Sequence, residues 1–383
     1  MTSIIRILPF LFLALSMFYY PQEVVNSASN GLQLWWEYVI PALLPFFILS
    51  ELLLASGFVH FLGVMLEPLM RPLFRLPGQA SFVVAMSFTS GIPIGAILTS
   101  KLRNQKILTQ EEGERLLAFT CNPSPGFMFG AVASGMLGRP ELGIVIAGSI
   151  YLANLLVGIV FRFYRVSETN RNSSLFPSPK IALRELQKAQ RADSRPFGKL
   201  LGDAVKQSIN NILMVGGFLV FFSVFVGLLE KLKITYALGY LSQKFTGGFL
   251  SFQEVSALVT GFLETTLGCE SVISSFTTLD LQIAILVGIL GWGGLSVFAQ
   301  VASFSSTTDL KFAPFVYGRI LQSLFAVILS QLFLSFIEIP VFQIHLPAEF
   351  GFWESWQLSS WIFCFTMSIL LILSLSMKVI KRR

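Results

Sequence analysis

The residues with the clearest capacity for chemistry are charged side chains inside otherwise apolar stretches. Glu264 and Glu270 lie in one such stretch, and Arg319 is the one base well inside another. A charged group at hydrocarbon depth is costly unless a partner or a ligand compensates for it, so residues of this kind are functional candidates. Arg319 is the natural counter-charge for the two acids or for an anionic substrate.

Polar residues also gather where Gly or Pro interrupts an apolar segment. Four such breaks occur: Ser87-Phe-Thr-Ser-Gly-Ile-Pro-Ile-Gly95, Thr120-Cys-Asn-Pro-Ser-Pro-Gly126, Leu263-Glu-Thr-Thr-Leu-Gly-Cys-Glu-Ser271 and Gly291-Trp-Gly-Gly294. Backbone N–H and C=O groups freed by a break cannot face lipid, so a break at membrane depth lines a cavity or is buried in protein. Helix N-termini at such breaks favour anions.

The predicted site combines the polar residues of the four breaks with the buried base. The substrate-binding candidates are Ser90, Gly91, Thr120, Asn122, Ser124, Glu264, Thr265, Thr266, Glu270, Ser271, Ser296 and Arg319. The residues predicted to break the helices are Pro93, Gly95, Pro123, Pro125, Gly126, Gly268, Gly291, Gly293 and Gly294. Any single break is more often a packing kink, and Glu264 paired structurally with Arg319 is the plain alternative, but four matched breaks favour a site.

The elements that must position these residues are membrane helices. Of the 383 residues 54% are hydrophobic and 13% are charged, against ~25% charged in soluble domains, and the mean hydropathy is +0.71. Two histidines and three scattered cysteines suit neither a zinc site nor a disulfide framework, so we expect no metal. Protease, hydrolase and phosphate-loop motifs are absent, so we expect no enzyme.

The Lys and Arg residues indicate how the apolar segments are oriented. Residues 162–206 carry ten bases and the C-terminal tail is basic, so both should be cytosolic, whereas 21–31 and 337–355 contain none and should be external. Eight crossings with both termini inside fit, provided that 79–100 and 253–278 are re-entrant hairpins. The predicted crossings are 7–20 (interpreted as a retained helix, not a signal peptide), 32–55, 113–137, 142–164, 207–229, 282–305, 312–336 and 355–377.

The two halves of the chain match weakly at an offset of about 168–176 residues, and they begin on opposite sides of the membrane. An inverted repeat of this kind is typical of secondary transporters, whose site lies near the midplane between the halves. The predicted divisions are an N-terminal transmembrane helix (1–30), a first repeat (31–165), a basic cytosolic linker ending in an interfacial helix (166–206), a second repeat (207–338), and an external loop, last transmembrane helix and basic cytosolic tail (339–383).

The break motifs as an ensemble resemble those of the nucleoside-recognition (Gate) domain proteins. The motifs are Ser90-Gly-Ile-Pro-Ile-Gly95, Cys121-Asn-Pro-Ser-Pro-Gly126, Glu264-Thr-Thr-Leu-Gly268 and Gly291-Trp-Gly-Gly294. More closely, residues 30–340 resemble sporulation integral membrane proteins of endospore-forming bacteria. The resemblance implies an all-α fold of two inverted repeats, each with a re-entrant hairpin and a broken helix, similar to concentrative nucleoside transporters.

The resemblance also implies a role in sporulation, as a carrier of dipicolinic acid out of the mother cell across the outer forespore membrane. Helix N-termini, hydroxyls and Arg319 suit this flat dianion. Glu264 and Glu270 suit it less, and are expected to bind a coupling cation, Na⁺ or H⁺, or the ring nitrogen while protonated; no cofactor is expected.

Two other functions stay open. Nucleoside carriers use such carboxylates on ribose hydroxyls, which keeps a nucleoside or nucleobase carrier as an alternative. A non-transporting membrane scaffold for spore assembly is the third. The expected partners are therefore a small anion and the lipid bilayer, without nucleic acid, and a homo-oligomer is compatible with the sequence.

Overall fold

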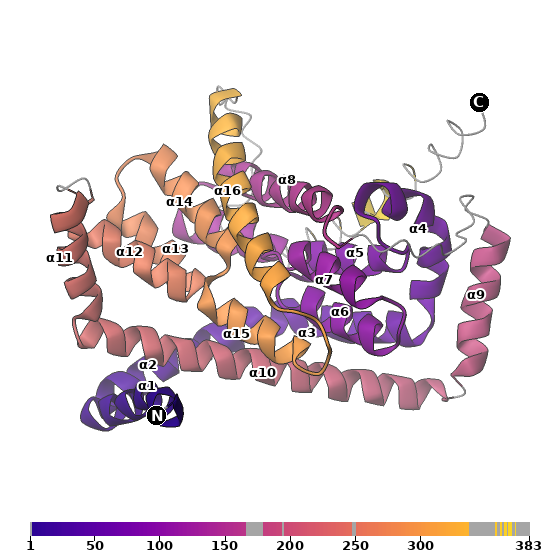
Figure 1. The fold of residues 1–383 in the computed structure, drawn as a ribbon, viewed down its shortest axis with the longest axis horizontal. Helices are drawn as coiled ribbons and strands as arrows, with labels where there is room; N and C mark the ends of the chain where they lie inside the picture. The colour runs from indigo at the N-terminus through magenta and orange to yellow at the C-terminus, as the bar shows by residue number, and fades with distance from the viewer. Residues whose placement is uncertain are drawn as a thin grey trace.

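The computed structural model describes residues 2–165, 179–193, 195–246 and 250–336, together with a few separate residues after 356. All regular elements in these ranges are helices (Figure 1). The predicted external loop, nearly all of the predicted last crossing and the basic tail, as well as the first part of the linker, lie outside the described residues.

The molecule is elongated, and one long helix runs along its length (Figure 1). This helix is α10, Phe197–Lys231. Two short helices, α4 (Phe58–Phe74) and α9 (Pro179–Ala192), stand at one end, and α11 (Ile234–Thr246) stands at the other. The chain begins with the helices α1 (Thr2–Tyr19) and α2 (Pro21–Leu34), and α2 packs along α10.

The first half of the chain continues from α2 through a π-helical turn at Trp35–Val39. Its later elements are α3 (Ile40–Ala55), α4, α5 (Ala80–Ser90), α6 (Ile94–Asn104), α7 (Gln110–Phe119), a π-helix η2 (Gly126–Met136), a short 3-10 helix at Pro140–Leu142 and α8 (Gly143–Phe161). The apolar parts of α3 and α4 meet at an angle of 83°. Gly57 turns the chain there with a φ of 77°, a conformation that costs glycine little.

The second half of the chain begins with α10 and α11. After α10 and α11 come α12 (Phe252–Leu263), α13 (Thr265–Ser275), α14 (Leu279–Trp292), α15 (Gly294–Ser305) and α16 (Ala313–Phe336). In each half two packed helices of 11 or 12 residues are followed by an interrupted helical stretch and then by a longer helix. We call α5–α6 the first hairpin, residues 120–125 the first break, α12–α13 the second hairpin and the α14–α15 junction the second break.

The chain is a polytopic membrane protein, as the composition predicts. Within the described residues four helical stretches are long and apolar enough to cross a bilayer: Pro140–Phe161, Phe197–Lys231, Leu279–Ser305 and Ala313–Ser335. The bent α3–α4 pair makes a fifth if it is taken as one span. The predicted crossing at 113–137 is divided by the first break into two helices of 10 and 11 residues.

One predicted boundary differs from the structure. The sequence predicts a linker (166–206) that ends in an interfacial helix and a crossing at 207–229, whereas α10 is a single helix from Phe197 to Lys231. The polar residues Gln207, Asn210 and Asn211 lower the local hydropathy, but no Gly or Pro interrupts the backbone hydrogen bonds between Lys206 and Met214. The helix therefore continues from the polar segment into the apolar one.

Candidate functional site

The first hairpin and the first break are fitted together backbone to backbone. A Cβ added to Gly95 would lie 1.6 Å from the Thr120 carbonyl oxygen, and one added to Gly91 would lie 2.6 Å from the Ser124 nitrogen. Gly91 also turns the hairpin, with a φ of 82°. Glycine at these two positions lets the turn of the hairpin contact the interrupted helix directly.

The second hairpin meets the second break in the same way. Gly293 and Gly294 both have positive φ, and a Cβ on Gly294 would lie 3.0 Å from the Leu263 carbonyl oxygen. The Trp292 indole stacks on the Phe262 ring at 5.2 Å, and its N–H donates to the Phe262 carbonyl oxygen over 3.1 Å. Each hairpin turn is thus held against the break of its own half.

One apolar cluster joins these two assemblies. Its buried members include Ala96 of α6, Cys121 of the first break, Val297 of α15 and Phe315 of α16, and Trp292 packs against it. The two breaks and the first hairpin therefore converge on a single interior region, with α16 beside it. This convergence brings residues of both halves of the chain into one candidate site.

Arg319 of α16 lies at this convergence and is fully buried. Its guanidinium donates to the Cys121 carbonyl oxygen at the first break and to the side-chain oxygen of Gln322. Gln322 in turn donates to the Asn122 side-chain oxygen over 2.8 Å. Within the described residues no carboxylate forms an ion pair with Arg319, so the predicted pairing with Glu264 or Glu270 is absent there.

Three polar atoms of the first hairpin, the first break and α16 are buried without a hydrogen-bond partner in the described structure. They are Ser90 Oγ at the first hairpin turn, Asn122 Nδ2 at the first break and Arg319 Nε itself. All three can donate a hydrogen bond. A buried donor without an acceptor costs about 1–3 kcal/mol, so this cluster is best satisfied by an added acceptor.

Glu264 occupies the turn of the second hairpin. It is the single residue between α12 and α13, it is 7% exposed, and its carboxylate accepts the Leu267 backbone N–H over 2.8 Å. The carboxylate thereby caps α13, where the helix dipole favours a negative charge. Thr265 Oγ1, next in the chain, is buried without a partner in the described structure.

The remaining predicted residues divide into those near the breaks and those away from them. Thr120 and Ser124 lie at the first break, but the Thr120 hydroxyl donates to Leu116 and Ser124 Oγ accepts from Phe127. Ser296 is buried in the first turn of α15. Thr266 is half-buried in the first turn of α13.

Four predicted residues lie inside helices rather than at turns. Three of them are in α13, because a single residue suffices for the second hairpin turn. Glu270 is exposed and Ser271 is half-buried, both within α13. Gly268 lies inside α13, where a Cβ would lie 2.1 Å from the Gly261 Cα of α12. Gly291 lies within α14 against Ser323 of α16. These glycines allow close helix packing and do not break the helices.

Two amides near the site were absent from the predicted set. Gln322 links Arg319 to Asn122, and Asn154 of α8 is fully buried with both amide atoms unpartnered in the described structure. Asn154 lies one helical turn after Tyr151 on α8. The Tyr151 hydroxyl donates to the Phe88 carbonyl oxygen of the first hairpin over 2.9 Å. A signal existed in the sequence, because Tyr151–Asn154 and Arg319–Gln322 occupy matching positions in the two halves.

Comparisons with known proteins support the resemblance seen in the motifs. A family model described as nucleoside recognition (Gate) matches residues 36–172, which include the first hairpin and the first break. An uncharacterised protein of Alkalihalophilus pseudofirmus is 27% identical over 154 residues, 39% of this chain and 33% of that protein. No solved structure gives a significant match.

A second relative is similar over most of its length. The sporulation integral membrane protein YlbJ of Bacillus subtilis is 45% identical over 333 residues, which cover 84% of this chain and 80% of that protein. The aligned region includes both hairpins and both breaks, and identity at this level over most of both chains shows a common family. The chain therefore belongs to the family of the sporulation integral membrane protein YlbJ.

Proposed function

We propose that the chain is a secondary transporter required for sporulation, which moves dipicolinate out of the mother cell across the outer forespore membrane by alternating access. Both termini are cytosolic in this proposal. Membership in a sporulation membrane protein family and the Gate match support a transporter-like role rather than catalysis. The substrate and the location are proposed from the family resemblance, and the mechanism from the arrangement of the site.

The observation that carries the proposal is the buried guanidinium of Arg319. Placing an arginine at the centre of a membrane helix costs roughly 2.5–3.5 kcal/mol on insertion scales. Here the group has two neutral acceptors, an unpartnered Nε and no carboxylate within the described residues. Ser90 Oγ and Asn122 Nδ2 are further unpartnered donors. A carboxylate of the substrate would provide an acceptor of the kind that these donors lack.

The two hairpins differ in a way that gives the anion one place to bind. No side chain caps the N-terminus of α6 in the first hairpin, whereas the Glu264 carboxylate caps α13 in the second. The second helix terminus is therefore already occupied by a negative charge and would repel an anion. Glu264 is the better candidate for a coupling cation, H⁺ or Na⁺.

The order of helices supports an inverted repeat and a likeness to concentrative nucleoside transporters. Each half contains a helical hairpin, an interrupted helical stretch and a longer final helix, and the helices that precede the two hairpins, α4 and α11, stand at opposite ends of the molecule (Figure 1). Two hairpins that enter from opposite sides and meet two broken helices would enclose a midplane site. Alternating access then requires the hairpin regions to move against α3 and α10.

The experiment is dipicolinate flux in proteoliposomes, compared with empty vesicles and with uridine. We expect flux in the wild type, a loss of at least tenfold in Arg319→Ala and a smaller loss in Arg319→Lys, which keeps the charge without the guanidinium fork. Tyr317→Phe, at an exposed position two residues away on α16, is the matched control and should transport normally. Normal flux in Arg319→Ala would remove the basis of the proposal.

A nucleoside or nucleobase carrier is the second candidate, favoured by the Gate match and by the buried carboxylate of Glu264. Uridine flux without dipicolinate flux would establish this alternative. Flux of neither compound, in protein that is shown to be folded, would favour the spore-assembly scaffold.

A further inference from the structure

The helix α10 carries a continuous stripe that changes from polar to apolar along its length. Lys206, Asn210, Leu213, Gly217 and Val220 follow one another at intervals of three or four residues, so they lie on one face. No charged residue separates Lys206 from Glu230. These 24 residue steps rise about 36 Å, close to the thickness of a bilayer core, so Lys206 marks one membrane interface.

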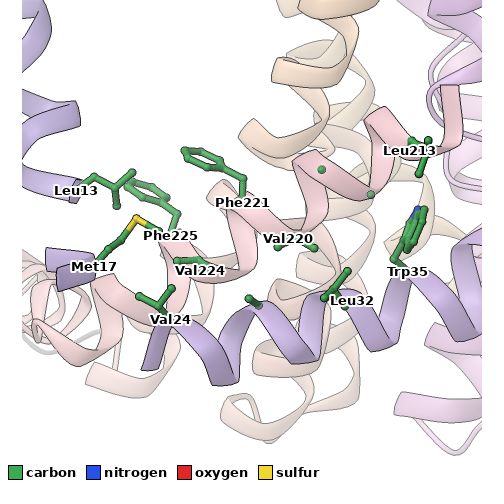
Figure 2. Close-up of a pocket in the computed structure, with 13 residues that line it drawn as sticks. Leu13, Met17, Val24, Leu32, Trp35, Leu213, Val220, Phe221, Val224 and Phe225 are labelled. Atoms are coloured by element: carbon green, nitrogen blue, oxygen red, sulfur yellow. The ribbon is translucent and has the colours of Figure 1, made fainter. Parts of the chain in front are cut away.

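The apolar part of this stripe forms one wall of a groove of about 500 Å³ (Figure 2). Leu213, Val220 and Phe225 of α10 face Val24 and Leu32 of α2, and residues of α1 close one end. Gly217 lies in the groove with open space around it, since a Cβ there would meet no atom within 4 Å. All thirteen lining residues are apolar or glycine.

The polar part of the stripe forms one wall of a cavity of about 380 Å³ between α10, α3 and α6. Its other charges are already paired: Lys101 with Glu51, and Arg195 with both Asp193 and Asp203 at 2.7 Å. Lys206 has no ion-pair partner within the described residues. Lys206 is therefore the lining base left without an ion-pair partner in the described structure, and it lies at the level of the membrane interface.

We propose that one phospholipid with an anionic headgroup binds along this face of α10. Its phosphate lies in the polar cavity at Lys206, and an acyl chain lies in the apolar groove from Leu213 to Phe225. These twelve residue steps rise about 18 Å, close to half of the ~30 Å hydrocarbon core, which is the depth that the chains of one leaflet reach. Lys206 and Leu213 are two turns apart, so one molecule spans both sites.

The charge argument selects this occupant. A basic pocket between membrane helices beside an apolar groove matches the two ends of an anionic lipid, with each lysine worth about 1 kcal/mol or roughly fivefold in affinity. A second copy of the chain would match the groove but would leave Lys206 without a counter-charge. The proposal is independent of the transported substrate.

The test uses the purified full chain in detergent, with phosphatidylglycerol and phosphatidylcholine of identical acyl chains as probes. Melting temperatures and native mass spectra report binding. We expect phosphatidylglycerol to bind more tightly and to stabilise more than phosphatidylcholine. Lys206→Ala should weaken phosphatidylglycerol binding about fivefold and phosphatidylcholine binding less, because the choline cation already compensates that phosphate, and Gly217→Leu, which fills the groove, should weaken both lipids.

Two matched variants serve as controls. Arg184→Ala removes an exposed charge from α9, and Gly198→Leu fills open space in the first turn of α10, outside the groove; both should bind lipid as the wild type does. Equal binding of the two lipids to the wild type, or unchanged binding in Lys206→Ala, would overturn the headgroup assignment. A shift of Gly217→Leu from dimer to monomer with unchanged lipid binding would instead assign the groove to a second copy.

Discussion

The carboxylate of Glu264 performs two functions that a substitution can separate. It caps α13 through the Leu267 N–H, and it places a negative charge in a buried hairpin turn. The cap needs only an acceptor oxygen, which a glutamine also provides. Binding of a coupling cation needs the charge or the capacity to take a proton.

We expect Glu264→Gln to keep the melting temperature near that of the wild type and to abolish transport. Glu264→Ala should also abolish transport, and it should destabilise the protein by about 1 kcal/mol because the cap is lost. Flux assays and thermal unfolding of the same preparations separate the two effects. Full flux in Glu264→Gln would show that the charge has no role in transport.

Gly95 tests the contact between the first hairpin and the first break. In Gly95→Ala the new methyl group would overlap the Thr120 carbonyl oxygen, and neither backbone can yield without moving the hairpin turn. We expect a loss of about 1–3 kcal/mol and strongly reduced transport. Gly198→Ala on α10, where a Cβ meets no atom within 4 Å, should be neutral in thermal unfolding and flux. A neutral Gly95→Ala would contradict this close fit.

At the scale of residues, the sequence identified candidate types but few of their partners. Arg319 stood out because a base inside an apolar helix is rare. Its acceptors, the Cys121 carbonyl oxygen and Gln322, became visible only in the structure because a carbonyl has no sequence signature and the first break lies 198 residues away. The single-residue turn at Glu264 was equally hidden among the polar residues up to Ser271.

At the scale of elements, the segment between α15 and α16 is bound to the end of the first hairpin and the start of α7. The Arg103 guanidinium donates two hydrogen bonds of 2.7 Å to the Asp309 carboxylate. The Lys311 backbone N–H donates to Glu114 of α7 over 3.0 Å, and Leu310 covers Gly113. These contacts join both halves into one unit that includes the first hairpin.

The ion pair in this contact predicts a dependence of stability on pH. The hydrogen bond and charge of Arg103 hold the pKa of Asp309 below its ordinary value. A carboxylate with a lowered pKa in the folded state stabilises the fold above its ordinary pKa of about 3.9, and this contribution is lost as the pH falls further. Asp309→Asn should therefore lower the melting temperature at pH 7.

The difference between Asp309→Asn and the wild type should shrink as the pH is lowered below about 4. Because the Asp309 side chain is 52% exposed, we expect less than about 1 kcal/mol at pH 7. Glu141→Gln, an exposed acid without an ion pair in the described structure, is the control. A difference that persists at low pH would assign the effect to something other than the ion pair.

Element boundaries were predictable where glycine or proline sets them. The chain turns at Gly91 and Gly293 because both adopt positive φ, and the prolines of the first break remove backbone donors. The length of α10 was not predictable from hydropathy, since polar residues on one helical face lower the average without ending the helix. Tertiary contacts with α2 and α3 along that helix decide its extent.

At the scale of the whole molecule, the proposed inverted repeat makes a topological prediction. Epitope tags at residues 175 and 345 should be accessible from opposite sides of the membrane, the first from the cytosol and the second from outside. The sequence predicts that both positions lie in connecting segments, and transport in the tagged proteins serves as the control for correct insertion. Accessibility from the same side would be incompatible with the inverted repeat.

The contact between Arg319 and the first break also has a consequence for biosynthesis. A chain is made from its N-terminus, so α7 and the first break enter the membrane before α16 leaves the ribosome. The acceptors of the arginine, the Cys121 carbonyl oxygen and the amide of Asn122 reached through Gln322, are thus already in place when the charge must leave water. If the order of the two halves were reversed in a permuted gene, Arg319 would enter the bilayer before its hydrogen-bond partners had been translated.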